Sequence, residues 1–165
     1  MYTLPEVAIY SDGACFKNPG PGGYGVVLIS DKGKRKELSG GFRHTTNNRM
    51  EILSAIMGLR TLKVKCRVTV YTDSRLLVDS IMKGWAKRWR KNNWMRNKDE
   101  KALNADLWEE MLTLIDKHEV TFKWIKGHAG HVENEHCDKL SKEAARGKKL
   151  PIDTGYENGN NHMPH

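Results

Sequence analysis

The sequence predicts one α/β domain in which a five-stranded mixed sheet is flanked by helices. Three strand-like runs come first, and helical patterns then alternate with two further strand-like runs. Strands joined by short turns pair antiparallel, whereas strands reached through helical crossovers run parallel. A chain of 165 residues is also the size of one ordinary domain with one core. We therefore expect three antiparallel strands followed by two parallel ones.

The first three strands are expected within the first 42 residues. Residues 7–10 and 24–29 are apolar runs, and the first of them ends at Asp12. Asn, Pro and Gly fill residues 18–23 between them and predict a turn. Residues 34–42 are polar enough to form an edge strand.

Helical spacing begins after these strands. Asn47 and Asn48 offer caps for a helix in which Ile52, Ile56 and Leu59 recur on one side. Further helices are expected at residues 76–82, 105–115 and 133–145, with strands at 68–72 and 120–125. From residue 151 to residue 165 the chain is polar and rich in Gly and Asn, which predicts a loose tail after a domain of residues 1–150.

Charge and cysteine content restrict the class of protein. Lys and Arg number 28 against 20 acids, a net charge of +8, which favours a polyanionic partner. The three widely spaced cysteines fit a reducing cytosol better than a disulfide framework, and Cys66 and Cys137 are expected to be buried. No run approaches the roughly 18 apolar residues that span a bilayer. We expect a soluble cytoplasmic monomer that needs neither a membrane nor a protein partner.

Two acids stand where apolar strands end. Asp12 and Asp73 should face each other if the first and fourth strands are parallel neighbours, because functional groups gather at the carboxyl ends of such strands. Glu51 shares a side of its helix with the small residues Ala55 and Gly58. Small neighbours let that helix approach the sheet, which would carry Glu51 towards the two aspartates.

Asp138 is a fourth candidate, since it borders the apolar side of its predicted helix beside Cys137. Taken singly, each of these acids is more often a solvated charge, a helix cap or an ion-pair member. Four converging carboxylates repel one another unless divalent cations neutralise them. Ligation by oxygen alone selects Mg²⁺ or Mn²⁺, and two such ions are the usual device for displacement at phosphorus.

Five motifs occur in order and carry a family resemblance: residues 10–15 (YSDGAC), 18–25 (NPGPGGYG), 45–51 (TTNNRME), 72–74 (TDS) and 126–131 (KGHAGH). Together they resemble bacterial type 1 ribonuclease H over most of the chain. The resemblance implies a ribonuclease H-like fold. It also implies an endoribonuclease that hydrolyses the RNA strand of RNA–DNA hybrids with two Mg²⁺ ions, for which Mn²⁺ could substitute. The products would carry 3′-hydroxyl and 5′-phosphate ends.

The resemblance assigns roles to individual residues. Asp12, Glu51, Asp73 and Asp138 would be the metal-binding carboxylates, and His128 would be a mobile auxiliary for proton movement or product release. Contacts with the nucleic acid would come from Cys15, Asn18, Thr46, Asn47, Arg75, Trp85, Lys87, Arg88, Trp89 and Asn104. Arg75 departs from the Gln that is common in the family, and His44 departs from an Arg. The neighbouring Arg43 stands where it could compensate for the second change.

Residues 83–101, here named the handle, hold most of the excess charge. They contain eight basic residues against two acidic ones and three of the five tryptophans. Basic residues interleaved with aromatic ones suit a surface that follows phosphates and stacks on sugars or bases. The resemblance makes this segment the part that grips the DNA strand. Packing of Trp85 onto the core is the alternative.

Other functions remain open at this point. Residues 20–25 could suggest a dinucleotide-binding loop, but such a loop opens a helix, and here a strand follows. His128, His131, His136 and Cys137 could suggest zinc, although their spacing and acidic surroundings disfavour it. A catalytically silent hybrid-binding module would need only the handle. A DNA-cutting nuclease on a related fold would share the acids.

Overall fold

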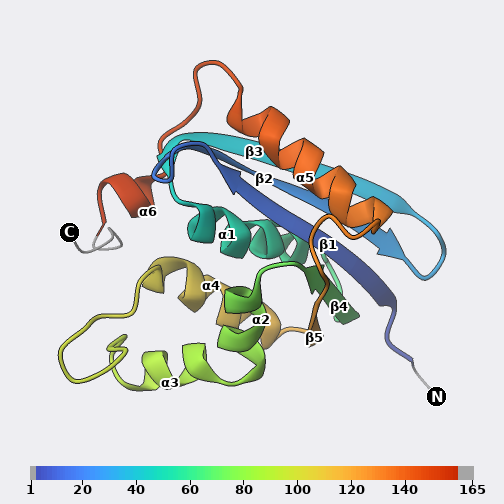
Figure 1. Ribbon diagram of the computed structural model, residues 1–165. Helices are drawn as coiled ribbons and strands as arrows, with labels where there is room; N and C mark the ends of the chain where they lie inside the picture. Colours follow the sequence, from blue (N-terminus) through green and yellow to red (C-terminus); the bar gives the residue numbers. More distant parts are fainter. Residues whose placement is uncertain (1–2, 160–165) are drawn as a thin grey trace.

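A computed structural model describes residues 3–159 and shows a five-stranded mixed sheet covered by helices on both faces (Figure 1). The strands are β1 (Glu6–Cys15), β2 (Gly20–Ser30), β3 (Arg35–Thr45), β4 (Arg67–Thr72) and β5 (Glu119–Trp124). Their spatial order is β3-β2-β1-β4-β5, with β1, β2 and β3 antiparallel and β4 and β5 parallel to β1. The predicted fold class and the edge position of β3 are confirmed.

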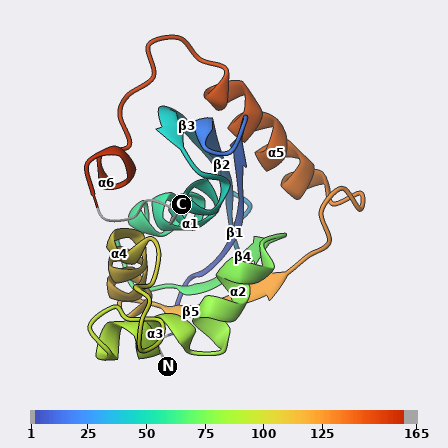
Figure 2. The ribbon, with the colours of Figure 1, turned by 60° about the vertical axis from the view of Figure 1, so that its left-hand side comes forward.

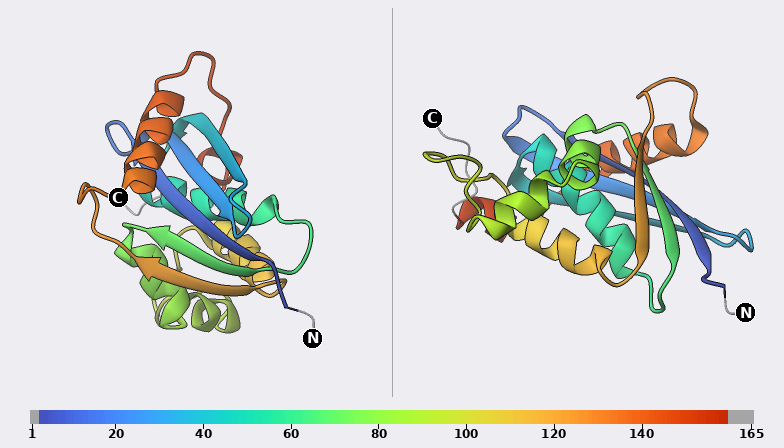
Figure 3. Two further views of the ribbon diagram at one scale, coloured as in Figure 1. Left: turned by 90° about the vertical axis from the view of Figure 1, so that its right-hand side faces the viewer. Right: turned by 90° about the horizontal axis from the view of Figure 1, so that it is seen from below.

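The helices are α1 (Asn47–Arg60), α2 (Arg75–Met82), α3 (Trp85–Lys91), α4 (Ala105–Ile115), α5 (Val132–Ala145) and α6 (Thr154–Glu157). Helix α5 covers one face of the sheet, and α1 covers the other with α2, α3 and α4 beyond it (Figures 2 and 3). Helices α3 and α6 have no counterpart among the predicted helices. Helix α3 buries only Ala86, so its sequence lacks an apolar period, and α6 is a single turn.

The turn predicted at residues 18–23 is wrong from Gly20 onward, because residues 20–25 form the first half of β2. Their glycines serve close packing. A Cβ at Gly23 or Gly25 would collide with the backbone carbonyl oxygen of Ser141 or Cys137 in α5. Because glycine has no side chain, α5 can lie directly on β2. The sequence pattern alone does not distinguish glycines of this kind from glycines in a turn.

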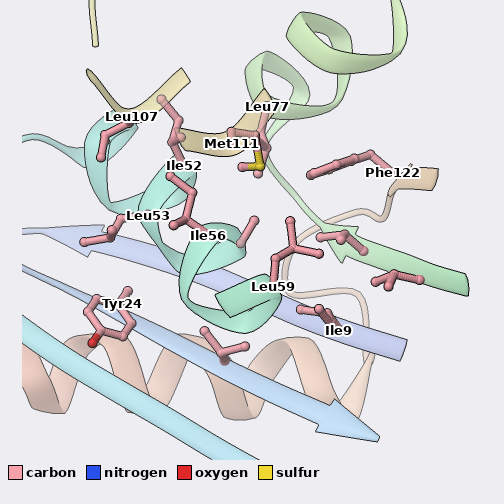
Figure 4. Close-up of a cluster of buried hydrophobic side chains, with 14 of the residues drawn as sticks. Ile9, Tyr24, Ile52, Leu53, Ile56, Leu59, Leu77, Leu107, Met111 and Phe122 are labelled. Atoms are coloured by element: carbon pink, nitrogen blue, oxygen red, sulfur yellow. The ribbon is translucent and has the colours of Figure 1, made fainter. Parts of the chain in front are cut away.

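The main core lies between the sheet and helices α1, α2 and α4 (Figure 4). Ile52, Ile56 and Leu59 are fully buried there, as their spacing predicts. The small side of α1 also approaches the sheet as expected, because a Cβ at Gly58 would lie only 2.9 Å from Ile9 Cγ2. This packing fixes α1, and with it Glu51, against β1.

The cysteines and the membrane expectation can be checked directly. Cys66 and Cys137 are buried as predicted, Cys15 is half-buried, and all three are free thiols. Within residues 3–159, no helix is both long and apolar enough to cross a membrane.

The segment after Pro151 differs from the loose tail that its composition predicts. Asp153 is only 7% exposed, and α6 follows it. The Asp153 carboxylate accepts hydrogen bonds from Arg49 Nε at 2.8 Å and from Thr45 Oγ1 at 2.6 Å. A buried guanidinium needs an acidic partner, so Asp153 holds this segment against β3 and α1, and Glu157 pairs with Arg43 of β3. The rest of the predicted tail, residues 160–165, lies outside the described part of the chain.

Candidate active site

Three of the four predicted carboxylates meet at one end of the sheet. Asp12 lies in β1, Asp73 directly follows β4, and Glu51 comes from α1. One oxygen from each carboxylate lies within 4.8 Å of the others. Glu51 Oε1 accepts a hydrogen bond of 2.7 Å from the backbone N–H of Gly13. A Cβ at Gly13 would lie 2.5 Å from the Glu51 backbone nitrogen, so glycine is required for this approach.

These carboxylates repel one another in a poorly solvated place. Burial is the main cause that raises the pKa of Asp12 to about 7, and the charges of Asp73 and Asp138 add to it, while a hydrogen bond with Glu51 partly offsets them. Burial and the charge of Asp12 raise the pKa of Glu51 well above its usual value. Within residues 3–159, Glu51 Oε2 is buried with no hydrogen-bond partner. Such a set of acceptors is suited to a divalent cation.

A pocket of about 440 Å³, here named the acid pocket, contains all four predicted acids and His128. Its lining residues are Asp12, Gly13, Ala14, Cys15, Phe16, Asn47, Glu51, Asp73, Ser74, His128, Asp138 and Lys142. Asp138 stands outside the group of three, and its carboxylate lies 3.0 Å from Lys142 Nζ. Lys142 is not among the residues predicted from the sequence, although its spacing of four residues from Asp138 on a helix is a usable signal.

His128 lies in the exposed loop before α5 and has a left-handed backbone, with φ of +56°. The loop is close to the acids at its start. A Cβ at Gly127 would lie 2.6 Å from Asp73 Oδ2, and Trp124 Nε1 donates a hydrogen bond of 3.0 Å to the Asp73 carbonyl. The imidazole is therefore carried on an exposed loop whose start is fixed beside Asp73.

Several predicted substrate contacts surround the N-terminus of α1. Thr46 caps the helix, because its Oγ1 accepts a hydrogen bond of 3.2 Å from Arg49 N while its own backbone is extended. The asparagines that follow, predicted as caps, lie within the helix, so the cap is one residue earlier than expected. Asn47 N–H donates to Asn18 Oδ1 at 3.0 Å, and Cys15 lines the adjoining acid pocket.

Arg49 connects Thr46 and Asn104, two of the residues predicted to contact the nucleic acid. Its backbone N–H is bonded to Thr46, and its Nη1 donates to Asn104 Oδ1 at 3.3 Å. Asn104 precedes α4 with φ of +62° and is 7% exposed. The two predicted residues thus lie at either end of one buried arginine.

The handle consists of α3 and the loop after it, below α1 and α4 in Figure 1. Lys87 and Arg88 are exposed, and Lys83 Nζ lies 5.5 Å from the ring centre of half-buried Trp85. Trp89 packs edge-on against buried Trp108, with 6.2 Å between ring centres. The two tryptophans that were grouped in the sequence analysis therefore have different surroundings.

The residues that depart from the family pattern also have defined neighbours. The Arg75 guanidinium lies 4.0 Å from the ring centre of Trp124, beside the acid pocket. The His44 ring lies 5.5 Å from that of Tyr156. Arg43, expected to compensate for His44, is paired with Glu157 at 2.9 Å.

Comparison with known proteins now decides the family. The sequence model of the RNase H family matches residues 5–146. The chain belongs to the ribonuclease H family. It is 63% identical to ribonuclease H of Desulforamulus reducens over 91% of this chain and 94% of the relative. It is 55% identical to ribonuclease HI of Synechocystis over 93% of this chain and 96% of the relative.

Solved ribonuclease H structures agree with this fold. LC9-RNase H1, a type 1 enzyme, superposes with a TM-score of 0.78 at 34% identity over 91% of this chain and 76% of that one. LC11-RNase H1, solved in complex with an RNA/DNA hybrid, gives a TM-score of 0.65 at 27% identity over 84% of this chain and 96% of that one.

Two alternatives raised by the motifs do not fit this chain. Residues 20–25 lie in a strand rather than at a helix start, so they cannot be a dinucleotide-binding loop. Across residues 3–159, histidine and cysteine side chains form no group close enough to hold zinc.

Proposed function

We propose that this chain is an endoribonuclease that uses Mg²⁺ to hydrolyse the RNA strand of RNA–DNA hybrids, leaving 3′-hydroxyl and 5′-phosphate ends. The observation that carries the proposal is the meeting of Asp12, Glu51 and Asp73 in the acid pocket of a ribonuclease H family member. The hybrid bound to LC11-RNase H1 supports the substrate. We further propose that the protein acts as a cytoplasmic monomer, in keeping with its free thiols.

The residues fit a pair of hard divalent cations. All four candidate ligands are carboxylates, and the unpartnered Glu51 Oε2 leaves an acceptor that a cation would satisfy. Asp12, Glu51, Asp73 and Asp138 would hold two Mg²⁺ ions, for which Mn²⁺ could substitute. When bound, the ions would activate the attacking water and stabilise the leaving oxygen.

The side chains around these acids would orient the reaction. Lys142, 3.0 Å from Asp138, holds that carboxylate at the pocket wall. His128 would transfer a proton from its exposed loop, the role that an imidazole commonly takes in general acid–base catalysis. Neither role requires a covalent link between protein and RNA.

Selectivity for a hybrid requires contacts that recognise a 2′-hydroxyl on one strand only. Cys15, Asn18 and Asn47 lie at or beside the acid pocket and would contact the RNA strand together with Glu51. Phosphates of the DNA strand would bind Thr46 and Asn104. The handle, through Trp85, Lys87, Arg88 and Trp89, and Arg75 at the start of α2 would extend the contact surface.

Cleavage of labelled nucleic acids of one sequence tests the proposed function. We expect the protein to cut only the RNA strand of the hybrid, with Mg²⁺ and not with chelator, and to leave double-stranded RNA and DNA intact. Hybrid binding without cleavage would identify a silent binding module. Cleavage of double-stranded DNA would identify a different nuclease on this fold.

The two tryptophans of the handle are expected to separate in a mutational test. Trp85→Ala should raise the KM for hybrid roughly tenfold, because stacking on a base or sugar is lost, with little change in Tm. Trp89→Ala should, besides any loss of substrate contact, lower the stability by about 2 kcal/mol, because Trp89 packs on Trp108. Steady-state kinetics and thermal unfolding measure both effects. If Trp85→Ala lowers Tm and leaves KM unchanged, Trp85 is a packing residue.

A further inference from the structure

A second pocket, here named the basic pocket, lies next to the acid pocket. It has a volume of about 690 Å³ and is lined by Phe16, Pro21, Arg43, Ala145, Arg146, Gly147, Lys149 and Leu150. Three of these residues are cationic and none is acidic. The composition of its wall indicates a ligand with negative charge.

The basic pocket is held in shape by backbone and side-chain contacts. The backbone N–H of Arg43 in β3 donates a hydrogen bond of 2.9 Å to the carbonyl of Pro151. This bond ties the loop after α5 to the edge of the sheet. The Arg146 guanidinium lies 5.0 Å from the ring centre of Phe16, which comes from the turn between β1 and β2. Three separate parts of the chain thus converge on the pocket.

Its cations are largely available for a ligand. Arg146 and Lys149 are exposed, and neither has an ion-pair partner among residues 3–159. Arg43 is paired with Glu157, but its side chain is still 57% exposed. Residues 139–149 contain five basic residues and one acidic residue, so the field around the pocket is positive. This is a second concentration of charge besides the handle.

The basic pocket continues from the acid pocket. Phe16 lines both of them. Lys142 lines the acid pocket, and Arg146 follows it by four residues at the end of α5, so the two cations lie one above the other along the helix. The handle lies on the opposite side of α1 from the β1–β2 turn and the end of α5 (Figures 1 and 2).

From this arrangement we infer that the basic pocket binds the phosphodiester backbone of the RNA strand where that strand leaves the acid pocket, on the side away from the handle. The inference rests on the proposed function. An RNA strand that leaves the carboxylates of the acid pocket past Phe16 would next contact Arg146, Lys149 and Arg43. Each phosphate neutralised there releases condensed counterions, so binding at this pocket strengthens as the salt concentration falls.

The variant Arg146→Gln/Lys149→Gln tests this inference, since Gln keeps much of each side chain and removes both charges. We expect the KM for a long hybrid to rise about tenfold and the slope of log KM against log salt to decrease by roughly 1 to 2, with kcat unchanged. Lys32→Gln/Lys34→Gln is the matched control. Lys32 and Lys34 are exposed in the β2–β3 turn, beside the start of β1. Their replacement also removes two charges.

Shortened substrates locate the contact. The RNA strand alone, or the DNA strand alone, is trimmed from each end around one fixed cleavage site. We expect the KM values of the variant and the wild type to become equal when the RNA strand is trimmed from one of its two ends, and to remain different when it is trimmed from the other. A difference that persists at every length, or that the control variant reproduces, would overturn the inference. Dependence on trimming of the DNA strand instead would overturn the assignment to RNA.

Failure of the proposed function can be recognised separately. In that case the wild type would not cleave the hybrid at all. Anisotropy of the same labelled hybrids, measured with chelator present, then decides the inference through the same comparison of variants and lengths. Equal affinities of wild type and variant on the longest hybrid would overturn it.

Discussion

Asp12→Asn is expected to reduce hybrid cleavage by on the order of 10³-fold or more, while hybrid binding is retained. Asp12 lies at the centre of the acids, within 4.8 Å of oxygens from Glu51 and Asp73. An amide in its place is neutral and a weaker ligand for Mg²⁺. Single-turnover cleavage and anisotropy of a labelled hybrid measure the two effects. Cleavage at the wild-type rate would remove Asp12 from the catalytic set.

The same variant has a second readout in the metal-free protein. The pKa of Asp12 is raised from 3.8 in a free carboxyl to about 7, mainly by burial. At pH 8 the charged form therefore destabilises the fold, and the penalty decreases as the pH falls from about 7 towards 4. We expect Asp12→Asn to raise Tm at pH 8 and to keep only the smaller part of this advantage at pH 5.

Asp116→Asn makes the matched control for both measurements. Asp116 is exposed at the end of α4 and does not line the acid pocket. The Asp116→Asn variant should cleave the hybrid at the wild-type rate. Its Tm difference from the wild type should be the same at pH 8 and at pH 5. A gain in Tm for Asp12→Asn that is equal at both pH values would contradict the assigned cause.

Much of the fold was predictable because local patterns and topology agree. Apolar runs ending at Asp12 and Asp73, with helical spacing between them, require a crossover and hence parallel strands. The glycines of β2 were not predictable, since a glycine chosen for close helix packing has the same appearance in a sequence as one chosen for a turn. Helix α3 was missed because its single buried residue, Ala86, provides no period.

The candidate site was predictable for a similar reason. The ends of two apolar runs identify Asp12 and Asp73, although β1 itself continues beyond Asp12 to Cys15. The small side of α1 identifies Glu51, so three acids follow from the sequence pattern and topology. The position of Asp138 relative to them does not, because the contact of α5 with the sheet depends on Gly23 and Gly25. Long-range partners of single charges carry no local signal at all, and the clearest case is Arg49.

Arg49→Met is expected to lower the stability by about 3–5 kcal/mol, the usual cost of removing one partner from a buried ion pair. Arg49 is 1% exposed. Its guanidinium donates to both oxygens of Asp153 and to both oxygens of Asp106. Without it, Asp153 is left charged and buried. Thermal unfolding should show a Tm lower by roughly 10 °C.

Arg67→Met is the matched control, because Arg67 pairs with Glu119 at 3.2 Å on an exposed part of the sheet. We expect it to cost less than about 1 kcal/mol. The double variant Arg49→Met/Asp153→Asn should lose less than the sum of the single variants, since the unpaired buried charge is gone. Strictly additive losses would contradict a direct interaction.

The pH dependence gives an independent check of the same contact. Burial raises the pKa of Asp153, but hydrogen bonds from Arg49 and Thr45 outweigh it, so the net pKa lies below 3.8. The stabilisation is therefore complete above about pH 4 and is lost as the pH falls through the lowered pKa. Arg49→Met should remove this stabilisation and leave burial to raise the pKa of Asp153. The difference in stability between wild type and variant should therefore be largest near pH 7 and shrink as the pH falls, first through the raised pKa of the variant and then through the lowered pKa of the wild type. Because Arg49 also holds Thr46 and Asn104, a parallel rise in KM for hybrid would link this buried charge to substrate binding.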